Sequence, residues 1–383
     1  MKMNEKASAI WSEYIIDGIR MNSSPGDILN TACREKKFLP KEETNITVII
    51  DETIDLPPSS NSFDEKKIEE YLLLTSSAQN RPRAFSLGYP EFMTKSIIAS
   101  TLLSSIWQKG HFCLKDLALS AFWKWDTSPV GNMSAFYRSV EAACDYLGSL
   151  GISLKNFSFK EDSSCSLSFS PVLDEAGDEV EDIPENESFL EPTIEKPLRR
   201  LEKTRKCGKH ISGDESSWIV YIPFDTCSFK LGASLLSEVT GNPGGKSPDL
   251  IDDEYFADCF EVVRELVEDG IVKAGVTVGS GGLMTALGEM VPKGKGLSAD
   301  ISGLMKSYAE NDLVSILFGE VPGVVLEIDD ADYDYIDAEF LLQDVAYYPL
   351  GHPSLKKSGL HITTSDLPDI SAIMHSLINN RFF

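Results

Sequence analysis

The stretch Ala274-Gly-Val-Thr-Val-Gly-Ser-Gly-Gly-Leu283 decides how the second half of this chain folds. The apolar residues 271–274 predict a strand that enters it, and residues 283–290 predict a helix that leaves it. Glycines let the backbone approach a ligand and expose N–H groups, and the helix N-terminus adds partial positive charge. The stretch therefore has the frame of a phosphate-binding turn. It offers only small neutral side chains such as Thr277 and Ser280, whereas catalysis or metal binding needs a His, Asp or Glu.

Strands and helices alternate on both sides of this turn. Such alternation predicts a layered α/β domain. The expected strands are 218–224, 323–328 and 345–350, the expected helices are 231–238, 254–268, 304–317 and 333–342, and a strand and a helix close the chain.

The N-terminal part predicts a second α/β domain. We place the boundary near residue 212, so that residues 1–212 and 213–383 form two domains. The expected helices of the first domain are 7–19, 94–108 and 134–150, and its expected strands are 46–50, 71–74, 117–123 and 164–169.

The formal net charge of −25 opposes binding to nucleic acid or to anionic membranes over most of the surface. One local exception lies in the expected linker 172–212, where the acidic block 174–191 precedes the basic block 196–209. The basic block is either a phosphate or nucleic-acid contact or half of a linker that neutralises itself. Blocks of like charge are commonly surface segments, which favours the linker.

The chain is expected to be cytoplasmic. No apolar run reaches the roughly 18 residues needed to span a bilayer, and the first residues lack the apolar core of a secretory signal. The seven cysteines are scattered singly without CxxC pairs, which argues against a disulfide framework and against a zinc site.

Two segments resemble known binding motifs, a P-loop and a calcium loop, but each lacks a residue that the motif requires. Residues 241–247 resemble the end of a P-loop, but Thr240 stands where the motif requires glycine. Residues 330–334 resemble the start of a calcium loop, but the sixth position is Tyr335 and not glycine. Neither segment predicts its usual ligand.

Several blocks resemble the second synthetase half of phosphoribosylformylglycinamidine synthase, which belongs to the aminoimidazole ribonucleotide (AIR) synthetase superfamily. The blocks occur in the family's order, and the resemblance covers most of residues 35–360. They are Phe224-Asp225, Leu231 to Ser234, Tyr255 to Phe260, Glu265 to Gly270, Gly281 to Leu283, Glu310 to Gly319, Pro322 to Val325 and, more weakly, Leu119 to Trp125 and Tyr137 to Asp145.

The resemblance implies a fold of two α/β domains, with paired N-terminal domains that form a shared barrel. It also implies an ATP-dependent amidine synthesis, in which the family holds a nucleotide through Mg²⁺ with acidic and amide ligands. We therefore expect a homodimer through the N-terminal domains, or a pair with another chain.

When the family's metal ligands are aligned one at a time with positions of this chain, most of them fall on other residue types. Its Glu and Asn become Thr101 and Ser105, and its His-Asp pair becomes Val276-Thr277. Residues 160–163 are a loose echo of its Gly-Lys-Asp-Ser loop, and one acidic position aligns with Glu43. Because Mg²⁺ usually needs one or two carboxylates, we expect no metal site and no catalytic residue.

We expect a divergent half-synthase that is non-catalytic, needs no cofactor, and keeps a vestigial phosphate- or nucleotide-binding turn with a binding or scaffolding role. The alternative is an active ATP-dependent ligase subunit of purine biosynthesis that uses ATP or ADP with Mg²⁺ and acts with separate chains. We expect this chain to lack the glutaminase domain and the other synthetase half. The candidate residues of the vestigial turn are Gly232, Ser234, Thr277, Gly279, Ser280, Gly281 and Gly282.

Overall fold

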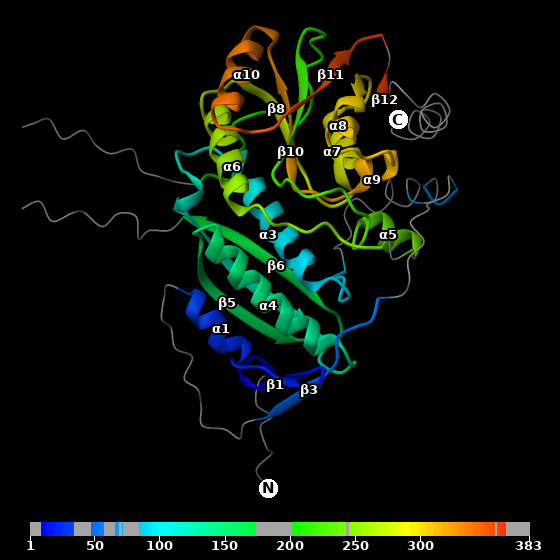
Figure 1. Ribbon diagram of the computed structural model, residues 1–383. Helices are drawn as coiled ribbons and strands as arrows, with labels where there is room; N and C mark the ends of the chain where they lie inside the picture. Colours follow the sequence, from blue (N-terminus) through cyan, green and yellow to red (C-terminus); the bar gives the residue numbers. More distant parts are fainter. Residues whose placement is uncertain are drawn as a thin grey trace, which may run out of the picture.

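Three β-sheets and the helices packed on them form this computed structural model (Figure 1). It describes residues 9–33, 47–56, 66–68, 71, 84–173, 201–242, 245–356 and 358–364. The two larger sheets each carry their own helices. The expected two-domain α/β architecture is confirmed.

The smallest sheet lies at the N-terminal end, in the order β2 (Ile19–Arg20), β1 (Glu13–Ile16), β3 (Val48–Asp51). Strand β1 pairs antiparallel with β2 and parallel with β3. The helix predicted over 7–19 is therefore wrong. Asp17 and Gly18 both have positive φ, and an Asp-Gly pair of this kind closes a tight hairpin rather than continuing a helix.

The middle sheet has the order β5 (Ser153–Glu161), β4 (Leu117–Trp125), β6 (Ser166–Leu173). Helix α4 (Asn132–Ser149) packs with α1 (Pro25–Ala32) and α3 (Pro90–Ile106). Trp123 and Phe136 meet edge to face in the core between this sheet and α4. Strand β5 includes residues 160 and 161, where the resemblance implies the start of a loop.

The C-terminal sheet has six strands, and helices lie on both of its sides in Figure 1. Its interior strands β7 and β10 run antiparallel, and all six residues of β10 are buried. In sheet order the strands are β12 (Gly359–Thr363), β9 (Gly296–Asp300), β11 (Tyr348–Ser354), β7 (Trp218–Pro223), β10 (Gly323–Ile328) and β8 (Val272–Val278).

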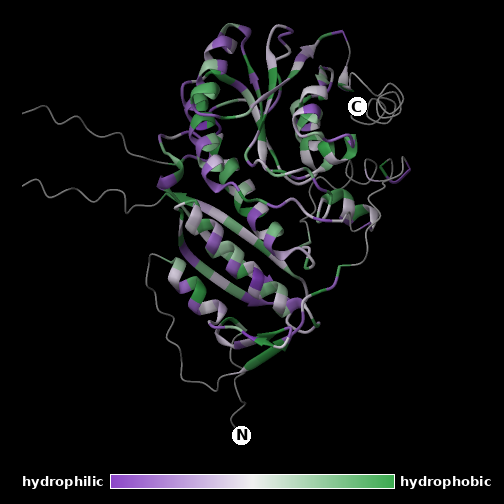
Figure 2. Cartoon of the chain, viewed as in Figure 1, coloured by the Kyte–Doolittle hydropathy of each residue, from purple (hydrophilic) through white to green (hydrophobic). Residues whose placement is uncertain are grey.

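The helices of this half include α5 (Leu235–Thr240), α6 (Asp253–Glu268), α7 (Gly282–Met290) and α10 (Tyr333–Leu342). The single helix predicted over 304–317 is two short helices, α8 (Ser302–Ser307) and α9 (Leu313–Phe318). Ala309, with φ of 48°, breaks the helical path, and Asp312 caps the new helix. In Figure 2 α6 shows polar and apolar residues along its length, as expected of a helix with one buried face.

The two halves meet where the end of α3 touches β8. The Trp107 ring lies against Gly275, and its Nε1 donates to Thr277 Oγ1 at 2.9 Å. Residues 201–212 run across this junction, and within them Gly208 bridges to Ala274 of β8. Residues 202–206 of the basic block are exposed here, and the role of the block as a linker remains a prediction. The boundary near residue 212 remains a prediction, and the acidic block 174–191 lies outside the described residues.

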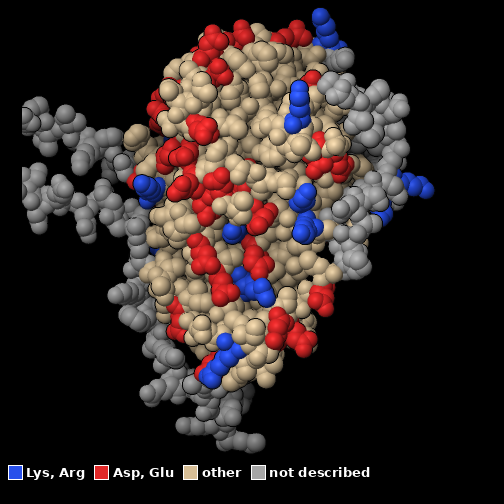
Figure 3. Space-filling view, in the orientation of Figure 1, with Lys and Arg blue, Asp and Glu red and all other residues tan. Residues whose placement is uncertain are grey.

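Acidic side chains outnumber basic ones on the face shown in Figure 3. Among the helices that the structure describes, none combines the length and apolar character that a bilayer span requires. All seven cysteines are free thiols. Burial raises the pKa of the Cys144 thiol to about 12, so this sulfur stays protonated at neutral pH.

Candidate functional site

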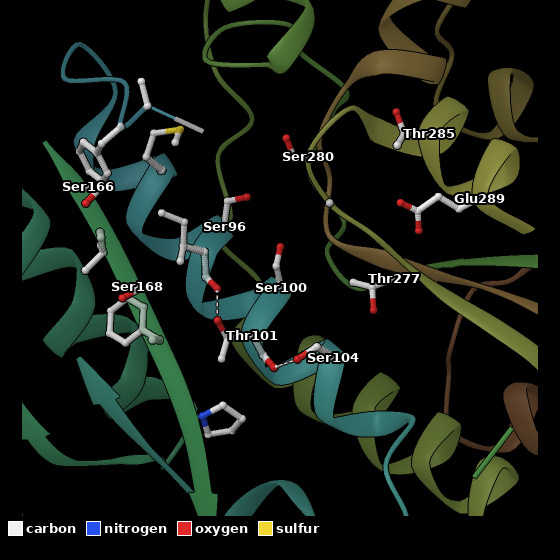
Figure 4. Close-up of a pocket in the computed structure, with 18 residues that line it drawn as sticks. Ser96, Ser100, Thr101, Ser104, Ser166, Ser168, Thr277, Ser280, Thr285 and Glu289 are labelled. Atoms are coloured by element: carbon white, nitrogen blue, oxygen red, sulfur yellow. Dashed lines mark hydrogen bonds between the residues drawn. The ribbon is translucent and has the colours of Figure 1, made fainter. Parts of the chain in front are cut away.

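A cavity of about 720 Å³ lies between the two halves, bounded by α3, β6, β8 and α7 (Figure 4). One part of its wall is apolar and the other carries hydroxyl groups. The apolar residues are Ala84, Phe85, Met93, Ile97, Leu167, Phe169 and Pro171, and the polar residues are Ser96, Ser100, Thr101, Ser104, Ser166, Ser168, Thr277, Ser280, Thr285 and Glu289, with Gly279 beside them.

Helix α3 supplies a row of hydroxyls because serines and a threonine recur on one of its faces. Thr101 Oγ1 donates to the carbonyl of Ile97 at 2.8 Å, and Ser104 Oγ donates to the carbonyl of Thr101 at 2.7 Å. Ser96 and Ser100 have no hydrogen-bond partner among the described residues. Ser96 is only 7% exposed, and Figure 4 shows its hydroxyl on the side of the helix that faces Ser280.

The opposite wall begins with the glycine turn. Gly279 approaches α3 so closely that a Cβ there would lie 3.0 Å from Ser100 Oγ, so a larger residue would narrow the cavity. Of the lining residues that the structure describes, Glu289 is the only ionisable one. Its carboxylate is paired with Lys209 at 3.0 Å, and both side chains are more than 40% exposed.

The rest of the turn is occupied by a carboxylate of the protein itself. Glu320 Oε1 accepts hydrogen bonds from the backbone N–H of Gly281 at 2.8 Å and of Leu235 at 2.7 Å. These donors stand at the N-termini of α7 and α5, and Glu320 is 1% exposed. The buried carboxylate thus takes the place that a phosphate would take at a helix N-terminus.

The predicted site residues divide into two groups. Thr277, Gly279, Ser280 and the replaced ligand position Thr101 lie together in the cavity. The remaining candidates make internal contacts outside it: Gly232 N–H donates to the Lys246 carbonyl, Ser234 caps α5, Gly281 donates to Glu320, Gly282 donates to the Gly279 carbonyl, and Ser105 Oγ donates to the Leu102 carbonyl.

Two further predicted positions contribute nothing to the cavity wall that the structure describes. The echo of the Gly-Lys-Asp-Ser loop, 160–163, lies at the end of β5, where Asp162 pairs with Lys124 at 3.3 Å. Glu43, the one acid aligned with the family, falls outside the described residues.

The cavity also contains residues that the sequence reasoning missed. The row Ser96, Ser100 and Ser104 has the four-residue spacing of one helix face, so the sequence carried this signal. Ser166 and Ser168 alternate with the buried Leu167 and Phe169 along β6, and residues of both sets border the cavity at this edge strand. Glu320 gave no such signal, because it lies 39 residues from the glycine turn.

The donor set is a poor match for magnesium. Mg²⁺ is held through carboxylates and bound waters, and the described wall offers hydroxyls and one ion-paired carboxylate. In the part of the chain that the structure describes, no three His, Cys, Asp or Glu side chains gather in a metal-binding arrangement.

Comparison with known proteins shows what this chain is similar to. Residues 230–337 match the model of "AIR synthase related protein, C-terminal domain". The probable chloroplastic/mitochondrial phosphoribosylformylglycinamidine synthase of Arabidopsis thaliana is 27% identical over 264 residues, which are 69% of this chain and 17% of that protein. The chain is related to phosphoribosylformylglycinamidine synthase. The Drosophila melanogaster synthase is 25% identical over 272 residues, 68% of this chain and 19% of that protein.

The synthase relative therefore spans less than a fifth of the length of these curated proteins. Among solved structures, PurL of Thermotoga maritima complexed with ATP is 13% identical and covers 74% of this chain and 40% of its own, with a TM-score of 0.47. Hydrogenase maturation protein HypE is 12% identical and covers 71% of this chain and 79% of its own, with a TM-score of 0.42.

Proposed function

We propose that this synthase relative is a non-catalytic binding protein whose cavity does not hold a magnesium nucleotide. The observation that carries the proposal is the chemistry of the cavity wall. Thr101 and Thr277 lie in the wall at positions where the resemblance implies metal ligands, and their side chains are neutral. Without clustered carboxylates the wall lacks the main attraction for Mg²⁺ and for the nucleotide that Mg²⁺ would bring.

The glycine turn supports the same proposal. An anion that enters it must displace Glu320, whose carboxylate already accepts from the N-termini of two helices. A phosphate would also meet the negative charge of Glu320 in a buried setting, where repulsion between like charges is strong.

Thermal unfolding with ATP or ADP and Mg²⁺ tests the proposal. A ligand at 100 times its dissociation constant stabilises a protein by about 2.7 kcal/mol. We expect no change in the melting temperature of this chain. The melting temperature of a catalytically active phosphoribosylformylglycinamidine synthase, measured in parallel, should rise. A saturable rise for this chain would show that the nucleotide site is functional.

The second candidate is an active ligase subunit that works with separate partner chains. The size of the cavity favours it, because about 720 Å³ suits a small-molecule substrate and the site lies between two domains. Loss of one catalytic group commonly costs about two to four orders of magnitude in rate. Ammonia-dependent ADP release, assayed with verified partner chains, decides the matter: we expect background turnover, and product above background would favour the subunit.

We further propose a cytoplasmic protein that pairs through its N-terminal half with a second copy or with another chain. Phe122 of β4 is 39% exposed on the face of the middle sheet that turns away from α4. Exposed aromatic side chains amid polar ones are typical of protein interfaces. Sedimentation measurements of the oligomeric state test the homodimer: we expect the wild type to pair and Phe122→Ser to pair less. A monomeric wild type at high concentration would leave only another chain as partner.

A further inference from the structure

We propose that the cavity between the two halves binds an uncharged glycoside, a sugar ring joined to a flat apolar group. This inference rests on the proposed function, because a site that held a magnesium nucleotide would favour phosphate. Three features of the wall carry it: free hydroxyls, an apolar strip, and the lack of an available cation among the described lining residues.

The hydroxyls fit a sugar because a serine both donates and accepts a hydrogen bond, as each sugar hydroxyl does. Ser96 and Ser100 on α3 and Ser166 and Ser168 on β6 line the cavity without a hydrogen-bond partner in the described chain. Ser96 is the decisive member of the set. The residue is only 7% exposed and borders the cavity, so a ligand in the cavity would meet its hydroxyl.

The apolar strip fits the remainder of such a ligand. Phe85 and Phe169 border the cavity and are held in place by edge-to-face contacts with Trp125 and Trp123. Ligand sites are usually lined by apolar and aromatic groups with a few convergent polar ones, in cavities of about 300–1,000 Å³. A cavity of about 720 Å³ has room for a sugar ring with its apolar group.

The charges at the cavity select against phosphorylated forms of the same ligand. Glu289 is the one charged group of the described wall, and the nearby Lys209 is already paired with it. Among the lining residues that the structure describes, a phosphate would therefore find no unpaired cation.

Calorimetric titration of the full chain tests the inference with three compounds: phenyl β-glucoside, adenosine and adenosine monophosphate. The first two compounds each carry a sugar ring joined to a flat group, but one is a simple glucoside and the other a nucleoside. The third compound adds a phosphate to the second. We expect at least one neutral glycoside to bind at millimolar concentration or better, and adenosine to bind more tightly than its monophosphate.

The double variant Ser96→Ala, Ser100→Ala identifies the hydroxyls concerned. Each lost hydrogen bond should weaken binding by about two- to tenfold. Ser158→Ala is the matched control, since Ser158 is exposed on β5 and does not line the cavity. Because alanine favours helix, the double variant is expected to melt no lower than the wild type.

Three results would overturn the inference and leave the proposed function standing. The first is the failure of both neutral glycosides to bind. The second is unchanged affinity in the double variant. The third is tighter binding of the monophosphate than of adenosine. Binding of ATP with Mg²⁺, measured separately, would instead overturn the proposed function.

Discussion

The buried carboxylate of Glu320 is the residue that most changes the interpretation of the glycine turn. In the sequence the turn looks like an exposed set of N–H donors that await an anion. In the structure a glutamate from the loop after α9 reaches back and accepts from Gly281 and Leu235. A charged acceptor at two helix N-termini stabilises the fold, since each end carries partial positive charge.

Glu320→Ala should lower the free energy of unfolding by about 2–5 kcal/mol, because it leaves two buried N–H donors unpaired. Chemical denaturation measures the change. Glu265→Ala is the matched control: this glutamate is exposed on α6, and its loss should change stability by less than about 0.5 kcal/mol. Equal stability of the two variants would show that the carboxylate is not needed by the turn.

The N-terminus of α4 shows the same arrangement at the scale of an element. Helix α4 has no side-chain cap of its own, because Gly131, with φ of 89°, precedes it. Asp51 at the end of β3 supplies the cap, and its carboxylate accepts from the N–H groups of Gly131, Met133 and Ser134 at 2.6 to 2.9 Å. This contact ties the smallest sheet to the main helix of the N-terminal half.

Asp51→Ala should therefore destabilise the protein by about 2–3 kcal/mol, more than a helix cap alone is worth, because several charge-assisted bonds are lost together. Asp145→Ala, on the exposed side of the same helix, serves as the control and should have little effect. Hydrogen exchange should locate the change, with faster exchange in the first turn of α4. Uniform exchange along α4 would contradict the capping role.

The elements were predictable where one face is plainly apolar. Helices α4 and α6 and strands β7 and β10 lie within a few residues of their expected positions. The failures have local causes: the Asp17-Gly18 hairpin lies within the predicted helix 7–19 and ends it. The cavity was half predictable: its turn has a sequence signature, but its wall joins α3, β6 and α7, which only the tertiary fold brings together.

At the scale of the whole molecule, aromatic contacts join the two halves, and one of them lies beside the cavity. Trp107 at the end of α3 fills the space over Gly275 of β8, and the Arg205 guanidinium lies 5.3 Å from the ring centroid. A Cβ at position 275 would overlap the ring. The absence of a side chain there sets how closely the halves approach.

Gly275→Ala should destabilise the protein by about 1–3 kcal/mol through overpacking, and it should loosen the junction between the halves. Gly148→Ala provides a control of opposite sign. Gly148 lies in α4 with free space around it, so alanine there should stabilise by up to about 1 kcal/mol. If Gly275→Ala were as stable as the wild type, the contact would not set the spacing of the halves.

Because Glu320 belongs to the same chain as the donors that it engages, its carboxylate competes with every dissolved anion as an intramolecular ligand. Even a short flexible tether gives an effective concentration on the order of millimolar, and a buried, fixed side chain exceeds that. Free phosphate would have to outcompete a permanent occupant. The glycine turn is therefore an anion-binding element that is already filled by a side chain of the same protein. A single substitution at position 320 would make it available to dissolved anions.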